Sequence, residues 1–199
     1  MVNNDAAVPY EYRGIDMKSF NHPAGLTKIT INNLCVGLLP TRIIVGFVQS
    51  AAFRGDYKKN PYNFEHFHLD TMSIYNGSTV LPTTPIKTVF GSNRFSTAFD
   101  YYFVEQMGLT REKTNGLTRD DFLGGYALYA FNLTPDLSST ADSETLSTLD
   151  KGIIWFEASF EKKLDNETTS VFFFEYEQKV EIDQFTNVHF DDFTPLLRS

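Results

Sequence analysis

Apolar and polar residues alternate with a period of two through much of this sequence, most clearly in its last third. Residues 172–182 alternate aromatic or β-branched side chains with Glu and Lys. One face of an extended chain over residues 153–160 would carry Ile154, Phe156, Ala158 and Phe160. This period predicts two long β-strands, each with one face toward a core, joined by a turn at residues 162–166.

Shorter strand patterns precede these two. Residues 42–48 (RIIVGFV) are an uninterrupted run typical of a strand buried on both faces. Residues 64–75 alternate as a long strand, and Asn76-Gly77 predicts a type I′ hairpin turn, in which both central residues have positive φ. The other predicted strands are residues 27–32, 79–81, 126–133 and 188–190.

Two segments carry helical signals. Residues 95–107 place apolar side chains at helical spacing behind Ser96 or Thr97 as the N-cap. Thr118, with an acidic residue three positions on, matches an N-terminal cap and predicts a single helical turn at residues 120–123.

The predicted elements fit one all-β domain. We expect an N-terminal arm over residues 1–26, a jelly-roll domain over 27–190 and a C-terminal tail over 191–199, with a Ser- and Thr-rich surface loop at 137–149. About eight strands without β-α-β alternation predict a jelly-roll β-sandwich of two antiparallel sheets of about four strands, with one or two short helices in the connections.

Composition supports a β fold and limits the partners. The 199 residues include 19 Phe and 10 Tyr but one Trp, and aromatic residues favour strands over solvated helices. The net charge of −8 opposes non-specific binding to nucleic acid. The densest basic cluster, residues 54–59, contains only three basic residues and is expected to be a solvated loop.

The single cysteine, Cys35, has no partner for an internal disulfide, which favours a reducing compartment. The first residues lack the basic and apolar regions of a signal peptide, so we expect neither secretion nor glycosylation of the three Asn-x-Ser/Thr sites. Uncharged stretches are far shorter than the roughly 20 apolar residues of a membrane span, so we expect none.

Only one group of residues suggests a metal site. His66 and His68 at i, i+2, followed by Asp70, would share a face of the predicted strand and could hold a metal, or could be polar residues of an exposed face. A cupin-type metalloenzyme would need a third ligand inside the barrel.

No other residues form a catalytic pattern, and we expect no enzyme, no cofactor and no metal. Cys35 lies between apolar residues and is expected to be a small buried side chain. Gly124-Gly125 lacks the Gly-Lys-Ser/Thr of a phosphate loop and is expected to be a turn. The acidic pairs Asp120-Asp121 and Asp191-Asp192 are expected to lie in solvated loops.

Four segments, in this order, resemble a known protein family. They are residues 39–48 (LPTRIIVGFV), 52–64 (AFRGDYKKNPYNF), 118–137 (TRDDFLGGYALYAFNLTPDL) and 180–183 (VEID). They resemble the C-terminal half of the hexon-like major capsid protein of Polinton (Maverick) elements and adintoviruses. The resemblance spans roughly residues 10 to 190, departs from the family at residues 137–149, and includes only the second of the family's two jelly rolls.

The resemblance implies a structural viral, or virus-derived transposon, capsid subunit. It would be one jelly roll of a double jelly-roll protein that forms trimeric, pseudo-hexagonal capsomers with itself and other capsid proteins. It would be assembled inside the host cell and located in the virion capsid. We expect Tyr57, Tyr62 and Phe64 to be contact anchors, or else to cap their own core.

Two alternatives stay open beside the capsid hypothesis and the metalloenzyme hypothesis. One is a single jelly-roll minor capsid or penton protein. The other is a β-sandwich binding module for a receptor or carbohydrate.

Overall fold

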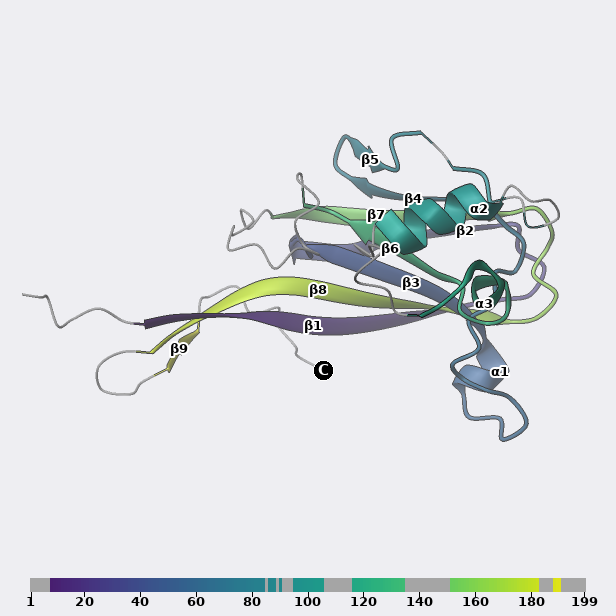
Figure 1. The fold of residues 1–199 in the computed structure, drawn as a ribbon, viewed down its shortest axis with the longest axis horizontal. Coiled ribbons are helices and arrows are strands. Elements are labelled where there is room, and N and C mark those ends of the chain that lie inside the picture. Colours follow the sequence, from purple (N-terminus) through teal and green to yellow (C-terminus); the bar gives the residue numbers. More distant parts are fainter. Residues whose placement is uncertain are drawn as a thin grey trace, which may run out of the picture.

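Two antiparallel β-sheets pack face to face in this protein (Figure 1). The computed structural model describes residues 8–84, 86–88, 90, 95–105, 116–134, 151–182 and 188–190. The elements are β1 (Val8–His22), β2 (Lys28–Leu38), β3 (Arg42–Gln49), α1 (Ser50–Phe53), β4 (Leu69–Asn76), β5 (Thr79–Leu81), α2 (Phe95–Ala98), the π-helix η1 (Phe99–Glu105), α3 (Arg119–Leu123), β6 (Leu128–Asn132), β7 (Lys151–Phe160), β8 (Thr168–Ile182) and β9 (Val188–Phe190).

The strand order is that of a jelly roll. Sheet A has the order β1-β8-β3-β6, with β9 also paired to β8, and sheet B has the order β2-β7-β4-β5. Apart from the pairs β4–β5 and β8–β9, successive strands pass from one sheet to the other, so most neighbours within a sheet come from distant parts of the chain. The predicted jelly-roll β-sandwich is therefore confirmed.

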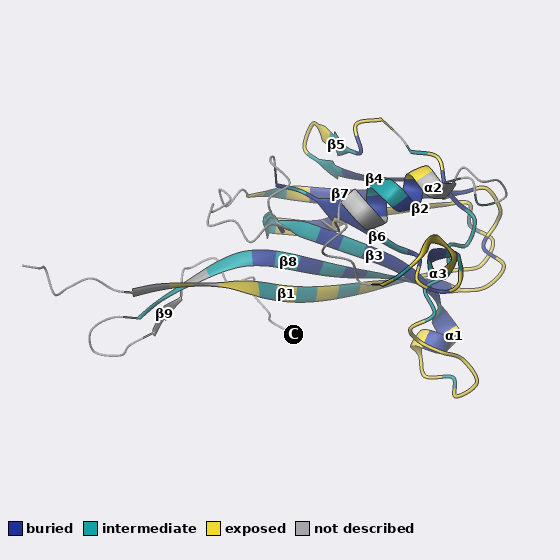
Figure 2. Ribbon diagram, in the orientation of Figure 1, coloured by how far each residue is buried: buried dark blue, intermediate teal, exposed yellow. Residues whose placement is uncertain are grey.

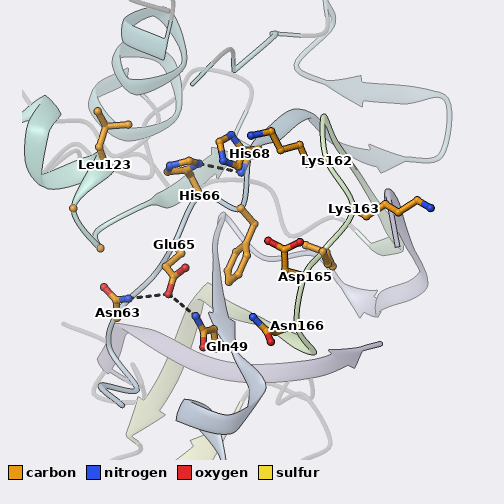
Figure 3. A pocket seen from close by; sticks show the side chains of 14 residues that line it. Gln49, Asn63, Glu65, His66, His68, Leu123, Lys162, Lys163, Asp165 and Asn166 are labelled. Atoms are coloured by element: carbon orange, nitrogen blue, oxygen red, sulfur yellow. Dashed lines mark hydrogen bonds between the residues drawn. The ribbon is translucent and has the colours of Figure 1, made fainter. Parts of the chain in front are cut away.

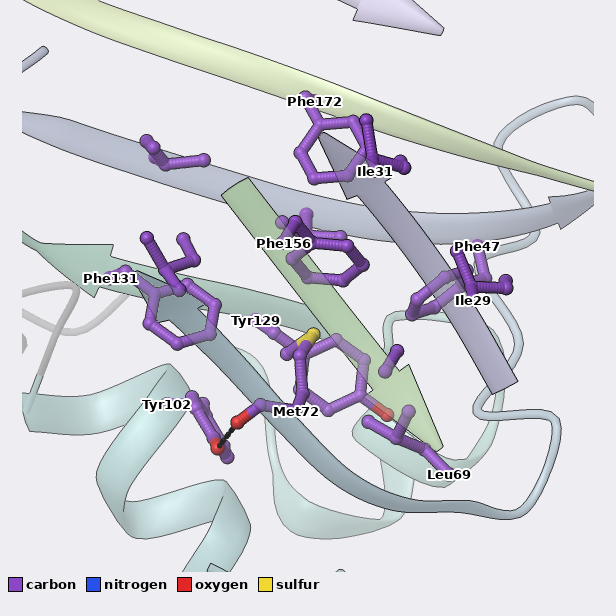
Figure 4. Packing of buried hydrophobic residues seen from close by; sticks show 14 of the residues in the cluster. Ile29, Ile31, Phe47, Leu69, Met72, Tyr102, Tyr129, Phe131, Phe156 and Phe172 are labelled. Atoms are coloured by element: carbon purple, nitrogen blue, oxygen red, sulfur yellow. Dashed lines mark hydrogen bonds between the residues drawn. The ribbon is translucent and has the colours of Figure 1, made fainter. Parts of the chain in front are cut away.

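Alternate side chains of both sheets meet in an aromatic core (Figure 4). Phe156 of β7 and Phe172 of β8 are fully buried and meet edge to face across the two sheets, with 5.0 Å between ring centroids. Full burial of such a side chain contributes about 1.5–3 kcal/mol. The predicted inner face of residues 153–160 is confirmed, since Ile154, Phe156, Ala158 and Phe160 are all buried.

The helical segments cover one side of this core. Residues 95–105 are helical as predicted, but mostly as a π-helix, and residues 106–107 lie outside the described part of the chain. Tyr102 of η1 is buried against Phe131 of β6 and donates a hydrogen bond to the carbonyl of Met72. The predicted turn at residues 120–123 is confirmed as α3, whose cap is a reciprocal pair of hydrogen bonds between Thr118 and Asp121.

Three local predictions were wrong. Residues 8–22, expected within an arm, form β1 and pair with β8 along their full length. Residues 64–68 are not part of a strand, because β4 begins at Leu69. The β4–β5 turn consists of Gly77 and Ser78, and only Gly77 has a positive φ, as in a type II′ rather than a type I′ turn. The predicted loop at 137–149 and tail at 191–199 lie outside the described residues.

Candidate functional site

The backbone around the two neighbouring histidines explains why they do not line a strand. Phe67 and His68 both have positive φ, 46° and 52°, which non-glycine residues adopt at a cost. The turn is held because the amide of Leu69 donates to the carbonyl of His66 at 2.9 Å, and the amide of His68 donates to Nδ1 of His66 at 3.0 Å. The prediction that His66, His68 and Asp70 share a strand face is therefore wrong.

The His66 ring is packed rather than exposed. It stacks on Phe90 with 4.0 Å between centroids and meets the ring of His68 edge to face at 5.0 Å. Burial, with a smaller contribution from His68, lowers the pKa of His66 to about 4. The neutral ring keeps Nδ1 as a hydrogen-bond acceptor. Among the described residues, no group of three or more His, Cys, Asp or Glu side chains is placed to hold a metal ion.

A polar cavity of about 570 Å³ lies beside these histidines (Figure 3). Glu65 accepts hydrogen bonds from Gln49 at 3.1 Å and Asn63 at 3.0 Å within it. Lys162 and Asp165 add one charge of each sign from the β7–β8 turn. The lining contains amide, carboxylate, imidazole and ammonium groups, which can hydrogen-bond a polar ligand.

Sequence reasoning missed this cavity. Its lining comes from the end of β3, residues 63–68, residues 123–125 and residues 162–166. These segments are distant in sequence and carry no shared motif, and only the jelly-roll connections bring them together.

The loop after α1 extends away from the sandwich (Figure 1) and carries exposed aromatic residues. Tyr57 and Tyr62 are 89% and 76% exposed, and Phe53 at the end of α1 is 46% exposed. We call Phe53, Tyr57 and Tyr62 the aromatic loop. This exposure shows that Tyr57 and Tyr62 do not cap the core, and their role as contact anchors stays a prediction.

Local hydrogen bonds fix the shape of the aromatic loop. The carboxylate of Asp56 accepts from the amide of Lys58, and the side chain of Asn60 accepts from the amide of Tyr62, both at 3.0 Å. An ion pair of 2.8 Å between Arg54 and Glu167 ties the loop to the turn before β8. Such a loop loses little conformational entropy when a partner binds.

Phe64 differs from the two tyrosines and packs on its own sheet. It is half-buried, its amide donates to the carbonyl of Gly125 at 2.8 Å, and its carbonyl accepts from the amide of Ala127 at 3.0 Å. Its ring lies where a Cβ atom on Gly46 would be, so it covers part of β3. Of the three predicted anchors, Phe64 therefore packs on its own chain, but on the outer face of sheet A rather than on the core.

The remaining sequence candidates have structural roles. Cys35 is buried, with Sγ 3.4 Å from the carbonyl of Leu38 and 3.6 Å from the hydroxyl of Tyr176, as expected of a small core residue. Asp121 caps α3, and hydrogen bonds from Thr118 lower its pKa.

The glycine pair ends α3 in a turn, as predicted. Gly124 is the C-cap residue of α3, and Gly125 has a φ of 119°. Asp191 and Asp192 lie outside the described residues. In the described parts of the chain, no helix has the length and apolar character needed to cross a lipid bilayer.

Comparisons with known proteins point to one architecture. No protein-family model matches the sequence. The chain is 27% identical over 135 residues to the uncharacterized protein F54H12.2 of Caenorhabditis elegans, a match that covers 64% of this chain and 31% of that protein.

Two solved structures share the fold. A chain in the cryo-EM structure of the Sputnik virophage aligns over 98% of this chain and 40% of its own length, with a TM-score of 0.51 and 11% identity. A chain of the PBCV-1 virus capsid aligns over 93% and 52%, with a TM-score of 0.51 and 9% identity. The chain spans about half or less of each of these proteins. The likeness shows a jelly-roll fold shared with these viral chains.

Proposed function

We propose that this chain is a structural capsid subunit without catalytic activity. It forms one jelly roll of a double jelly-roll major capsid protein of the Polinton and adintovirus type, from a virus or a virus-derived transposon. It assembles into trimeric, pseudo-hexagonal capsomers inside the host cell and is located in the virion capsid.

The observation that carries this proposal is the strand order. Sheets of order β1-β8-β3-β6 and β2-β7-β4-β5 form a jelly roll, and two chains from viral particles align with nearly all of it. Because both of those chains extend well beyond the aligned part, the alignment is compatible with one jelly roll of a larger protein. We place the start of the jelly-roll domain, expected at residue 27, at β1.

The aromatic loop supports self-assembly. Large exposed rings such as Tyr57 and Tyr62 bury much area at low entropic cost when a partner covers them, and aromatic residues dominate interface energies. The loop is fixed in shape before contact and therefore suits the repeated contacts of a shell.

The test is light scattering on a size-exclusion column over a series of protein concentrations, with metal content measured on the same sample. We expect a metal-free trimer or larger assembly. Replacing both Tyr57 and Tyr62 by Ser is expected to weaken that assembly without lowering the unfolding temperature, because neither ring is in the core. A monomer at every concentration, or stoichiometric metal, would contradict the proposal.

A second candidate function is binding of a carbohydrate, and the polar cavity is the observation that favours it. Amide and carboxylate side chains such as Asn63, Glu65 and Asp165 are the groups that hydrogen-bond sugar hydroxyls. Binding to a glycan array by the unmodified chain, lost in an Asp165→Ala variant, would favour this function over a purely structural one.

A further inference from the structure

The outer face of sheet A, which points away from the core, carries one row of side chains that is apolar across all four main strands. Strand register places Met17 of β1, Phe173 of β8, Ile44 of β3 and Ala130 of β6 in one row. The next row begins with Ser19 and Val171, and Phe64 covers it at Gly46. We call the row of Met17, Phe173, Ile44 and Ala130, together with Ile15, the outer apolar row.

These side chains are not part of the core. Their sequence neighbours, such as Ile43 and Phe174, belong to the core cluster, whereas Ala130 is fully buried without belonging to it. Met17 and Ile15 are 60% and 59% exposed. Figure 2 shows exposed positions along β1, where these two side chains lie.

The outer face of sheet B shows what a solvated face of this fold looks like. There, one cross-strand row is Thr30, Glu157 and Ser73, and the next is Lys28, Ser159 and Thr71. An antiparallel sheet with one face in water normally places polar side chains on it. Sheet B follows that rule over these two rows, although its rows of Trp155 with Tyr75 and of Ile153 with Val36 are apolar. Sheet A departs from the rule in a row that crosses four strands.

Charged side chains beside the outer apolar row lie next to side chains of opposite charge in the same chain. Arg42 and Glu175 form two hydrogen bonds of 2.7 and 2.9 Å, and their side chains are only 12% and 13% exposed. Arg13 lies opposite Glu177 in the register. This face is thus neutral on a chain of net charge −8.

Charge and shape together identify the occupant. A nucleic acid or an anionic membrane requires cations in excess, which this face lacks. A flat, neutral, apolar sheet face suits a surface of the same kind. It is also where two copies of an acidic chain can approach with the least repulsion.

We propose that the accessible part of the outer apolar row, the exposed Met17 and Ile15 with the half-buried Phe173 and Ile44, is a contact surface on which a second copy of this chain packs. The inference rests on the proposed function and adds to it a surface through which copies of the chain meet. The aromatic loop then contributes additional contacts.

The test compares two substitutions of matched exposure on opposite sheets. Met17→Lys places a charge on the outer apolar row. Val36→Lys places one on β2 of sheet B, at a residue that is 64% exposed and lies opposite only Ile153 in the register. Both variants are measured by light scattering over the same concentration series as the unmodified chain, after circular dichroism has established that they are folded. Ile15→Lys provides a second probe of the row.

We expect Met17→Lys and Ile15→Lys each to raise the dissociation constant of the assembly at least tenfold, and Val36→Lys to change it less than threefold. If the three variants assemble like the unmodified chain, the proposed surface is wrong while the capsid proposal stands. If the unmodified chain is monomeric throughout, the capsid proposal fails and this inference fails with it.

Discussion

The rings of Tyr102 and Tyr129 meet edge to face with 5.7 Å between centroids, but their hydroxyls differ in hydrogen bonding. The Tyr102 hydroxyl donates to the carbonyl of Met72 at 3.0 Å. The Tyr129 hydroxyl is fully buried and has no hydrogen-bond partner among the described residues. Burial raises the pKa of both hydroxyls, so both stay protonated at neutral pH.

We predict that Tyr129→Phe leaves the free energy of unfolding unchanged or raises it by up to about 1 kcal/mol, because it removes a buried polar group without a partner. Tyr102→Phe is the matched control and should lower that free energy by about 0.5–1.5 kcal/mol, because it leaves the Met72 carbonyl unpaired. Urea unfolding of both variants measures the difference. Equal losses in the two variants would show that the Tyr129 hydroxyl is bonded.

Acid should destabilise the fold through His66. Its pKa is about 4 in the folded chain and 6.5 when exposed, so between these values the unfolded chain binds a proton that the folded chain does not. Stability is thus fully present above pH 6.5 and falls toward pH 4, by about 1–2 kcal/mol once partial exposure is allowed for.

The matched control for this acid effect is His66→Asn, whose side-chain oxygen can accept from the amide of His68 but does not titrate. The unfolding temperature of this variant should fall less between pH 7 and 4 than that of the unmodified chain. His22, whose pKa is also lowered by burial, contributes to the acid effect in the same direction. Identical pH profiles would rule out His66 as the source.

Two ion pairs, one to β8 and one to the turn before it, should contribute unequally to the free energy of unfolding. Glu175→Gln, in the nearly buried pair with Arg42, should lower the free energy of unfolding by about 1–3 kcal/mol. Glu167→Gln, in the pair with Arg54 whose side chains are 50–60% exposed, should change it by less than about 1 kcal/mol. Chemical denaturation compares them, and a larger loss for Glu167→Gln would contradict the assignment.

Position 46 requires glycine because the ring of Phe64 packs directly against it. A Cβ atom there would lie 2.5 Å from Cδ1 of Phe64 and 3.0 Å from Cδ2 of Leu128. Gly46→Ala should therefore lower the free energy of unfolding by about 1–3 kcal/mol. Adding Phe64→Leu to Gly46→Ala should recover part of that loss, which a double-mutant cycle by thermal unfolding would measure. Strictly additive losses would show that the ring does not constrain position 46.

Periodicity predicted the strands that alternate apolar-in and polar-out, such as β7 and the first half of β8. It missed β1 because core-facing positions such as Lys18 and His22 are polar, although Phe20 packs against the core. Lys18 lies 5.5 Å over the ring of Phe174 and donates to the carbonyl of Leu34 at 3.0 Å, so its stem packs while its charge is satisfied. The outward positions Ile15 and Met17 are apolar instead. From the sequence alone, this inverted pattern predicts a polar arm.

The prediction of a strand over residues 64–68 failed for a different reason. Residues 64–69 alternate in hydrophobicity like a strand, but the left-handed backbone at Phe67 and His68 is invisible to any hydrophobic period. The exposure of Tyr57 and Tyr62 followed from their loop composition. Phe64 is also aromatic, but its ring packs on β3, where Gly46 leaves space for it.

The pairing of β1 with β8 sets a lower limit on how soon the protein can become native during its synthesis. His22 and Ser170, joined by a 2.8 Å hydrogen bond between these strands, are 148 residues apart. A ribosome needs roughly 7 to 30 s to add that much chain. Until β8 emerges, β1 has no partner in sheet A and sheet B lacks the layer that covers its core face. The waiting chain exposes strand edges and aromatic side chains, which are the features that make incomplete chains prone to aggregate.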